Sequence, residues 1–272
     1  MGSKRNFQDK VVFLTGAAGG LGRAMARVFG RAGARICLTD LDGPAAAALA
    51  EELKSEGHDC LGLPLDVTSE EECRAAVNKA VEHFGRLDVL INNAGLTHRS
   101  PFVQTEARVF HRVMAVNFFG SLYCTQAALG HLIPSRGLII VISSIAGLAP
   151  LLGRTGYSAS KHALHGLFES LRTELTGAGV AVMIVCPGFT RTNIDKNALD
   201  GDGRPTSHPQ STVGRVASPE SVAHAILAAA SREKRLLVLS TVGRLTYWLT
   251  RLCPGLYEKI MARAVASELQ RG

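Results

Sequence analysis

The stretch from Lys10 to Gly22 constrains the fold more than any other part of the chain. Residues 10–14 form a short apolar run, which is typical of a buried strand. A glycine-rich turn, residues 15–22, and a helical pattern follow directly. Strand, glycine turn and helix in this order are typical of a βαβ unit that binds a dinucleotide, because glycines let the backbone approach a pyrophosphate and the helix N-terminus attracts its charge. A tight turn without a ligand is the alternative interpretation.

An acidic residue ends the second apolar run. Residues 34–39 are strand-like, and Asp40 follows, 18 positions after Gly22. At this distance a carboxylate is expected to accept hydrogen bonds from the adenosine ribose. It would repel a 2′-phosphate, and no Lys or Arg follows within several residues to offset it. Asp40 therefore favours NAD over NADP; the alternative is a solvated carboxylate that opens a loop.

A tyrosine and a lysine stand four residues apart, at Tyr157 and Lys161. This spacing places them on one helix face, where an ammonium can favour a phenolate. Ser144, thirteen residues before Tyr157, follows a strand-like run and could hold a substrate oxygen. Such a set suits proton transfer to or from an alcohol or carbonyl oxygen. Tyr-x-x-x-Lys also occurs by chance, so the pair alone is weak evidence.

Taken together, these motifs resemble the classical short-chain dehydrogenase/reductase family over nearly the whole chain. The family's glycine motif matches Thr15, Gly16, Gly20 and Gly22, and its later landmarks match Asp66-Val67, Asn92-Asn93-Ala94-Gly95, Asn117 and the segment from Pro187 to Thr192. The stretch from Tyr157 to Leu164 is most similar to the hydroxysteroid and retinol dehydrogenase branch. No catalytic position departs from the family pattern.

The resemblance implies a role for each matched residue. It implies a catalytic set of Asn117, Ser144, Tyr157 and Lys161, with Ser144 and Tyr157 meeting the substrate and Asn117 holding a water next to Lys161. From its own pattern, Asn117 would be a helix-interior asparagine that bonds a backbone carbonyl. The implied cofactor contacts are Gly16, Gly20, Leu21, Gly22, Asp40, Asp66, Val67, Asn93, Ala94, Gly95, Tyr157, Lys161, Pro187, Gly188, Thr190 and Thr192.

Length and periodicity predict one α/β domain over residues 1–272, with 46% apolar residues to form its core. Strand-like runs alternate with helical patterns such as 44–57 and 70–84, which predicts a Rossmann fold: a doubly wound parallel sheet of about seven strands with helices on both faces. The strand-like runs are residues 11–15, 34–39, 60–65, 87–91, 137–143, 180–186 and 235–239.

The polar composition of residues 197–219 predicts a loop, and we expect a substrate lid over 189–219. The six cysteines include no Cys-x-x-Cys pair and are expected to be small buried hydrophobes in a reducing compartment, with no metal site. His98 is the one histidine expected to rim the pocket, where it and Arg154 could meet a polar substrate group or face solvent.

The C-terminal segment carries much of the charge. Residues 232–272 hold eight Lys or Arg against three Asp or Glu, five of the net +7, mixed with aromatic and apolar residues. We expect a helical extension over 240–272, divided at Pro254-Gly255, that caps the pocket or a subunit interface. The alternative is contact with an anionic membrane surface.

The expected activity is hydride transfer between NAD(H) and a secondary alcohol or ketone, with Tyr157 as general acid/base. An apolar segment, residues 145–152, together with Phe189 predicts a lipophilic substrate of steroid, retinoid or fatty type. The alternatives are a nucleotide-binding sensor and a membrane-peripheral module led by the basic tail. No signal core or spanning segment is evident, so a cytoplasmic protein is expected. The resemblance implies a homodimer or homotetramer built through helices at 100–131 and 156–177, and no recognition motif for nucleic acid is present.

Overall fold

The computed structural model describes residues 5–192, 197–206, 208 and 215–265. Its strands and helices alternate along the chain, as the sequence predicts. The strands are β1 (Val11–Thr15), β2 (Arg35–Asp40), β3 (Cys60–Pro64), β4 (Val89–Asn92), β5 (Leu138–Ile142), β6 (Ala181–Cys186) and β7 (Leu236–Val238).

The connections between strands are mostly helical, and in the described part of the chain α8 and α9 follow β7. The α-helices are α1 (Gly20–Arg31), α2 (Gly43–Ser55), α3 (Glu70–Phe84), α4 (Ala107–Met114), α5 (Gly120–Leu132), α6 (Thr155–Glu174), α7 (Pro219–Ala230), α8 (Thr241–Leu252) and α9 (Pro254–Val265). Short turns of helix are η1 (Phe102–Gln104), η2 (Ala115–Phe119), η3 (Ile145–Gly147) and η4 (Leu175–Ala178).

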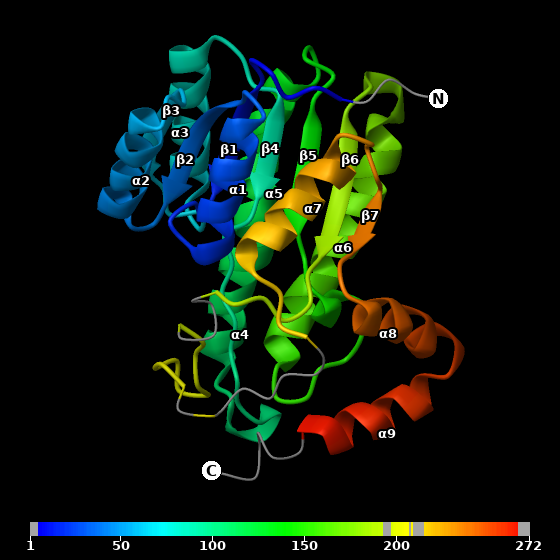
Figure 1. Ribbon diagram of the computed structural model, residues 1–272. Helices are drawn as coiled ribbons and strands as arrows, with labels where there is room; N and C mark the ends of the chain where they lie inside the picture. Colours follow the sequence, from blue (N-terminus) through cyan, green and yellow to red (C-terminus); the bar gives the residue numbers. More distant parts are fainter. Residues whose placement is uncertain (1–4, 193–196, 207, 209–214, 266–272) are drawn as a thin grey trace.

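The seven strands form one parallel sheet in the order β3-β2-β1-β4-β5-β6-β7. The predicted Rossmann architecture is therefore confirmed. The order reverses between β1 and β4, and ligands of such sheets bind outside the carboxyl ends of the strands at this point. Figure 1 shows these carboxyl ends pointing toward α4 and α8, away from the N-terminus.

Two apolar layers cover the sheet because alternate strand residues point to opposite faces. One layer joins α1, α2 and α7 to residues such as Val12, Leu14 and Ile36; the other joins α3, α5 and α6 to Val11 and Phe13. These strand side chains are at most 1% exposed. Both faces of the sheet are thus buried. A ligand site is therefore expected at the carboxyl ends of the strands, where sheets of this type bind their ligands.

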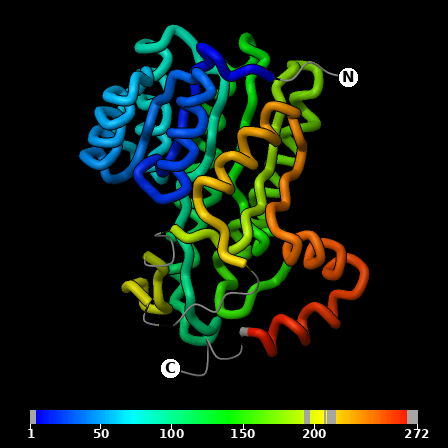
Figure 2. Tube along the Cα trace, viewed as in Figure 1, coloured from blue at the N-terminus to red at the C-terminus, as the bar shows by residue number. Residues whose placement is uncertain are grey.

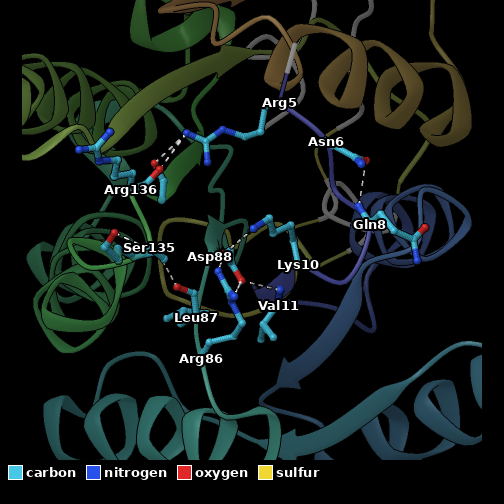
Figure 3. Close-up of polar contacts among 12 residues, drawn as sticks. Arg5, Asn6, Gln8, Lys10, Val11, Arg86, Leu87, Asp88, Ser135 and Arg136 are labelled. Carbon is cyan, nitrogen blue, oxygen red and sulfur yellow. Dashed lines mark hydrogen bonds and ion pairs between the residues drawn. The ribbon is translucent and has the colours of Figure 1, made fainter. Parts of the chain in front are cut away.

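At the amino ends of the strands, opposite the carboxyl edge, a polar cluster surrounds Asp88 (Figure 3). The buried Asp88 carboxylate accepts hydrogen bonds from Arg86, at 2.6 and 2.7 Å, and from the Val11 N–H at 3.0 Å; Lys10 lies 3.5 Å away. Burial opposes the charge of Asp88, but these partners outweigh it and lower its pKa. This cluster joins the starts of β1 and β4.

The predicted helix over 100–131 differs from the structure. Pro101 has extended ψ (145°), as does Glu106 (146°), so η1 is a separate turn and α4 begins only at Ala107. A short π-helix, η2, then joins α4 to α5, and the backbone stays helical at both junctions, so the helix is continuous from Ala107 to Leu132. The predicted lid (189–219) and extension (240–272) each lie partly outside the described residues, while α8 and α9 form the described part of the extension.

Candidate active site

The glycine turn after β1 lies against the loop after β4. Gly16 has a positive φ of 63°, and a Cβ there would lie 2.9 Å from the Ala94 Cα. A Cβ on Gly22 would lie 2.2 Å from the Gly16 carbonyl oxygen. Both positions therefore require glycine, because the turn, the first turn of α1 and the loop after β4 approach backbone to backbone.

Thr15 and Asn93 fix this contact. The Thr15 hydroxyl accepts from the N–H groups of Asn93 and Ala94, both at 3.0 Å. The Asn93 side-chain amide donates to the carbonyls of Thr15 and Gly16, both at 2.9 Å. Asn93 was expected as a cofactor contact, and the structure shows its side chain holding the glycine turn.

Asp40 lies at the carboxyl end of β2, next to the glycine turn. Its carboxylate accepts from the Ala18 N–H at 2.9 Å and from the Asp42 N–H at 3.1 Å. Arg23 also reaches this turn through the Ala18 carbonyl, at 3.2 Å, but its guanidinium pairs with Glu52 at 3.4 Å. The Asp40 carboxylate is thus fixed beside the turn, while the guanidinium of Arg23 pairs with Glu52.

Asp66 and Val67 lie just after the carboxyl end of β3. The Asp66 carboxylate accepts from Thr68, at 2.9 Å from its N–H and 2.8 Å from its hydroxyl. Val67 packs so closely on α5 that a Cβ on Gly120 would lie 2.7 Å from its side chain. These contacts hold the pair at the carboxyl edge of the sheet.

Lys161 is buried on α6 behind this edge. Its ammonium donates to the Ile142 carbonyl at 2.9 Å, which joins α6 to the end of β5, and lies 5.7 Å from the centre of the Tyr157 ring. Burial lowers the pKa of Lys161 to about 8. The structure therefore brings Tyr157 and Lys161 together, as their spacing predicts.

Asn117 lies in η2, which is a short π-helix. Such π-helical segments within α-helices often occur at functional sites. Its amide donates to the Leu96 carbonyl at 2.9 Å and to the Ser160 hydroxyl at 2.8 Å, and its oxygen accepts from the Leu96 N–H at 2.7 Å. A Cβ on Gly95 would lie 3.5 Å from the Asn117 oxygen and 3.8 Å from the Lys161 nitrogen. Asn117 and Lys161 thus flank the same loop.

Ser144 follows β5 and begins η3. Its hydroxyl oxygen accepts from the Ala146 N–H at 3.1 Å. Because that bond uses an oxygen lone pair, the hydroxyl hydrogen is available to donate. Ser144 lies two residues after Ile142, which holds Lys161, so one strand end positions both groups.

The segment after β6 lies over the glycine turn. The Ile145 N–H donates to the Pro187 carbonyl at 3.2 Å, and Thr190 pairs with Ala217 in a short parallel bridge. A Cβ on Gly20 would lie 3.4 Å from Thr192. The described part of this segment therefore contacts both η3 and the start of α1.

His98 has a role that the sequence did not reveal. Its side chain is fully buried, and its Nε2 accepts from the Gly156 N–H at 2.9 Å, so it holds the first turn of α6 next to Tyr157. Burial, with a contribution from Arg154, lowers the pKa of His98 to about 4, and the ring stays neutral near pH 7. Arg154 is 4% exposed, so neither residue faces solvent.

Ser160 is a second residue that sequence reasoning missed. Its hydroxyl accepts from Asn117 and donates to the Tyr157 carbonyl at 2.7 Å. It therefore joins η2 to the first turns of α6. Its place between Tyr157 and Lys161 on one helix was the only signal in the sequence. That place alone does not indicate the hydrogen bond to Asn117.

Comparison with known proteins points to one family. The model of the short chain dehydrogenase family matches residues 10–203. "Dehydrogenase/reductase SDR family member 7B" of Bos taurus is 36% identical over 269 residues, covering 96% of this chain and 83% of its own. "Dehydrogenase/reductase SDR family protein 7-like" of Drosophila melanogaster is 36% identical over 279 residues, which cover 97% of this chain and 83% of the relative.

A solved structure shows the same fold. It is a short chain dehydrogenase/reductase from Burkholderia phymatum in complex with NAD, with a TM-score of 0.83, 26% identity, and coverage of 93% of this chain and 96% of its own. The chain therefore belongs to the short-chain dehydrogenase/reductase family of oxidoreductases.

The residues present fit the dinucleotide that this family uses. The glycine turn is a cradle that a Cβ would fill at Gly16 and Gly22. Gly19, which caps α1, has no side chain to occupy the N–H groups of the first turn, so they are positioned for a phosphate. Asp40 is the last residue of β2, and in folds of this kind an acidic residue near this point of the chain can bond the adenosine ribose.

Proposed function

We propose that this protein oxidises a secondary alcohol, or reduces the matching ketone, with NAD(H). The observation that carries the proposal is the buried Lys161 ammonium, held by Ile142 next to the Tyr157 ring, on the sheet edge that also carries the glycine cradle. Bound NAD(H) supplies the hydride chemistry. The protein's own groups manage the proton.

Tyr157 is the proposed general acid/base. As a phenolate it takes the hydroxyl proton during oxidation, and as a phenol it returns a proton during reduction. Lys161 favours the phenolate through its charge, and Ser144 donates its free hydroxyl hydrogen to the substrate oxygen. Asn117 holds the turn beside Lys161, where a water can connect the ammonium to solvent.

The proton role is tested with Tyr157→Phe, using Tyr123→Phe as the matched control on α5. Turnover is followed at 340 nm with NAD⁺ and a panel of hydroxysteroids, retinols and aliphatic secondary alcohols. We expect Tyr157→Phe to lower kcat by about 10²- to 10⁴-fold while NADH binding is retained, and the control to stay near wild type. Equal turnover by both variants would contradict the role. Nucleotide binding by wild type without turnover of any panel member would favour the sensor alternative.

The preference for NAD(H) over NADP(H) is supported by Asp40, because its carboxylate lies beside the glycine turn and would repel a 2′-phosphate. In Asp40→Ala we expect the ratio of NADPH to NADH affinity to rise about tenfold. Asp42→Asn is the control, because it removes a nearby charge but keeps the cap of α2. An unchanged ratio in Asp40→Ala, or an equal rise in both variants, would count against this role.

A lipophilic substrate is supported by the apolar segment after Ser144. Ile145 packs between the segment after β6 and α8, since a Cβ on Gly188 would lie 3.5 Å from its side chain and one on Gly243 2.7 Å. Leu148 and Ala149 are buried beside it. Apolar walls with few polar groups favour steroid-, retinoid- or fatty-type alcohols over sugars.

A further inference from the structure

Helix α8 buries small residues and exposes large apolar ones, the reverse of an ordinary surface helix. Its buried residues are Gly243 and Thr246. Its large apolar side chains face outward: Leu245 is 66% exposed, Trp248 60% and Leu252 74%. A surface helix of a globular protein normally turns its apolar stripe toward the core, so α8 presents a surface that needs a partner.

The helical geometry separates these two sides. At 3.6 residues per turn, the apolar residues of α8 fall within an arc of about 120°, and the residues packed against the body fall on the opposite side. Arg244 and Arg251 border the apolar arc on one side. The Arg251 guanidinium lies over the Tyr247 ring, 3.7 Å from its centre, and Tyr247 packs edge-on against Trp248. The arc is therefore edged by arginines and an aromatic side chain.

Helix α9 packs next to α8 and also exposes large apolar side chains. Leu256 is 52% exposed and Ile260 51%. The other side of α9 is fixed to the body, because the Tyr257 hydroxyl donates to the Pro150 carbonyl at 3.0 Å and the Leu152 N–H lies 3.3 Å from the Met261 sulfur. Figures 1 and 2 show both helices, orange and red, at the outer edge of the fold near the carboxyl end of the sheet.

We call Leu245, Trp248, Leu252, Leu256 and Ile260 the α8–α9 ridge. The charges around it have one dominant sign. Within residues 240–265 the basic residues outnumber the single acidic residue, Glu258; they are Arg244, Arg251, Lys259 and Arg263. An apolar ridge edged by cations and aromatic rings matches the boundary between anionic lipid headgroups and acyl chains.

We propose that the α8–α9 ridge docks this protein on an anionic membrane surface. A second copy of the chain is a poorer partner, because a two-fold interface through this patch would place the same arginines near one another. Across the described residues, no helix has the length and apolar character needed to span a bilayer. In the proposed contact, the ridge lies in the plane of the headgroups.

The helix that carries the docked surface also contacts the candidate site through its opposite side. Ser240, which caps α8, lies beside Gly188, and the Thr250 hydroxyl contacts the Leu148 carbonyl at 3.5 Å. If the proposed function holds, a lipophilic substrate would reach the site from the bilayer side. The docking itself does not depend on turnover and is tested without it.

Trp248 is the chain's single tryptophan, so its fluorescence reports on the ridge alone. The full chain is titrated with vesicles of phosphatidylcholine containing phosphatidylserine, and with phosphatidylcholine alone. We expect a blue shift with the anionic vesicles and quenching of Trp248 by brominated acyl chains. The proposal would be overturned if, at saturating lipid, the Trp248 emission maximum did not shift and acrylamide still quenched its fluorescence. A blue shift on raising the protein concentration without vesicles would also overturn it, by showing that a second copy covers the ridge.

Variants that keep Trp248 identify the groups responsible. Leu245→Ser combined with Leu252→Ser is expected to reduce co-sedimentation with anionic vesicles about tenfold or more. Arg244→Gln combined with Arg251→Gln is expected to reduce it about fivefold per arginine, with a weaker dependence on salt. Ile133→Ser, which changes an exposed side chain after α5, is the control and should pellet as wild type does. Equal pelleting of all four proteins would contradict the proposal.

Discussion

Helices α1 and α8 use apolar residues in opposite ways. Helix α1 buries Met25, Val28 and Phe29, at 0–4% exposure, against the sheet. Helix α8 buries Gly243 and Thr246 and exposes Leu245, Trp248 and Leu252. The first arrangement stabilises the monomer, while the second leaves apolar surface that only a partner can cover. The contrast separates the part of the chain that builds the fold from the part that we propose contacts a membrane.

The largest expected difference comes from removing one aromatic side chain from each helix. Phe29→Ala should lower the free energy of unfolding by about 3–5 kcal/mol, because Phe29 is fully buried. Trp248→Ala should change it by about 0.5 kcal/mol or less, since Trp248 is mostly exposed. Urea unfolding of both variants without lipid measures this difference. A large loss in Trp248→Ala would show that the ridge is part of the core.

The ridge exposes apolar side chains, whereas Lys161 is a charged side chain that is buried. Its folded-state pKa of about 8 lies below the ordinary 10.5, so holding the ammonium costs stability below about pH 8, and this cost disappears as the pH rises toward 10.5. Lys161→Met should therefore be more stable than wild type at pH 7, by about 2 kcal/mol after allowing for the lost bond to Ile142.

The measurement is the unfolding free energy of unliganded wild type and Lys161→Met between pH 7 and 10. The difference between them should shrink as the pH rises above 8. Lys54→Met, at an exposed position of α2, is the control and should show no such trend. A difference that is independent of pH would mean that Lys161 is not held as a strained ammonium.

The smallest expected effect concerns the caps of α2 and α8. The Asp42 side chain accepts from the Ala45 N–H at 3.0 Å, and the Ser240 hydroxyl accepts from the Gly243 N–H at 2.8 Å. Each cap should contribute about 1 kcal/mol. Asp42→Ala should lower global stability by that amount, whereas Ser240→Ala should mainly speed hydrogen exchange within α8. Equal global losses would show that α8 unfolds together with the core.

The sheet and the glycine turn after β1 were predictable from sequence because their signals are local. Apolar runs mark the strands, and the glycines mark backbone contacts such as the one between Gly16 and Ala94. The spacing of Tyr157 and Lys161 likewise predicts their shared face, since four residues make about one helical turn. In each case the physical cause lies within a few neighbouring residues.

Features that depend on distant contacts were not predictable. His98 becomes a buried acceptor only because the loop after β4 meets the first turn of α6, 58 residues later. The π-turn at Asn117 and the inverted packing of α8 depend on which neighbours the fold supplies. Apolar periodicity predicted a helix in the C-terminal segment but did not indicate which side of it would be covered.

We propose that the carboxyl edge of the sheet binds a nicotinamide dinucleotide, and nicotinamide fluorescence measures this binding. NADH and NADPH are titrated separately into wild type, Gly16→Ala and Gly130→Ala; a Cβ at Gly130 meets nothing within 4 Å. We predict saturable binding, tighter for NADH, in wild type and Gly130→Ala, and its loss in Gly16→Ala, whose side chain would collide with Ala94. Absence of binding of either nucleotide to the folded wild-type protein would contradict the account.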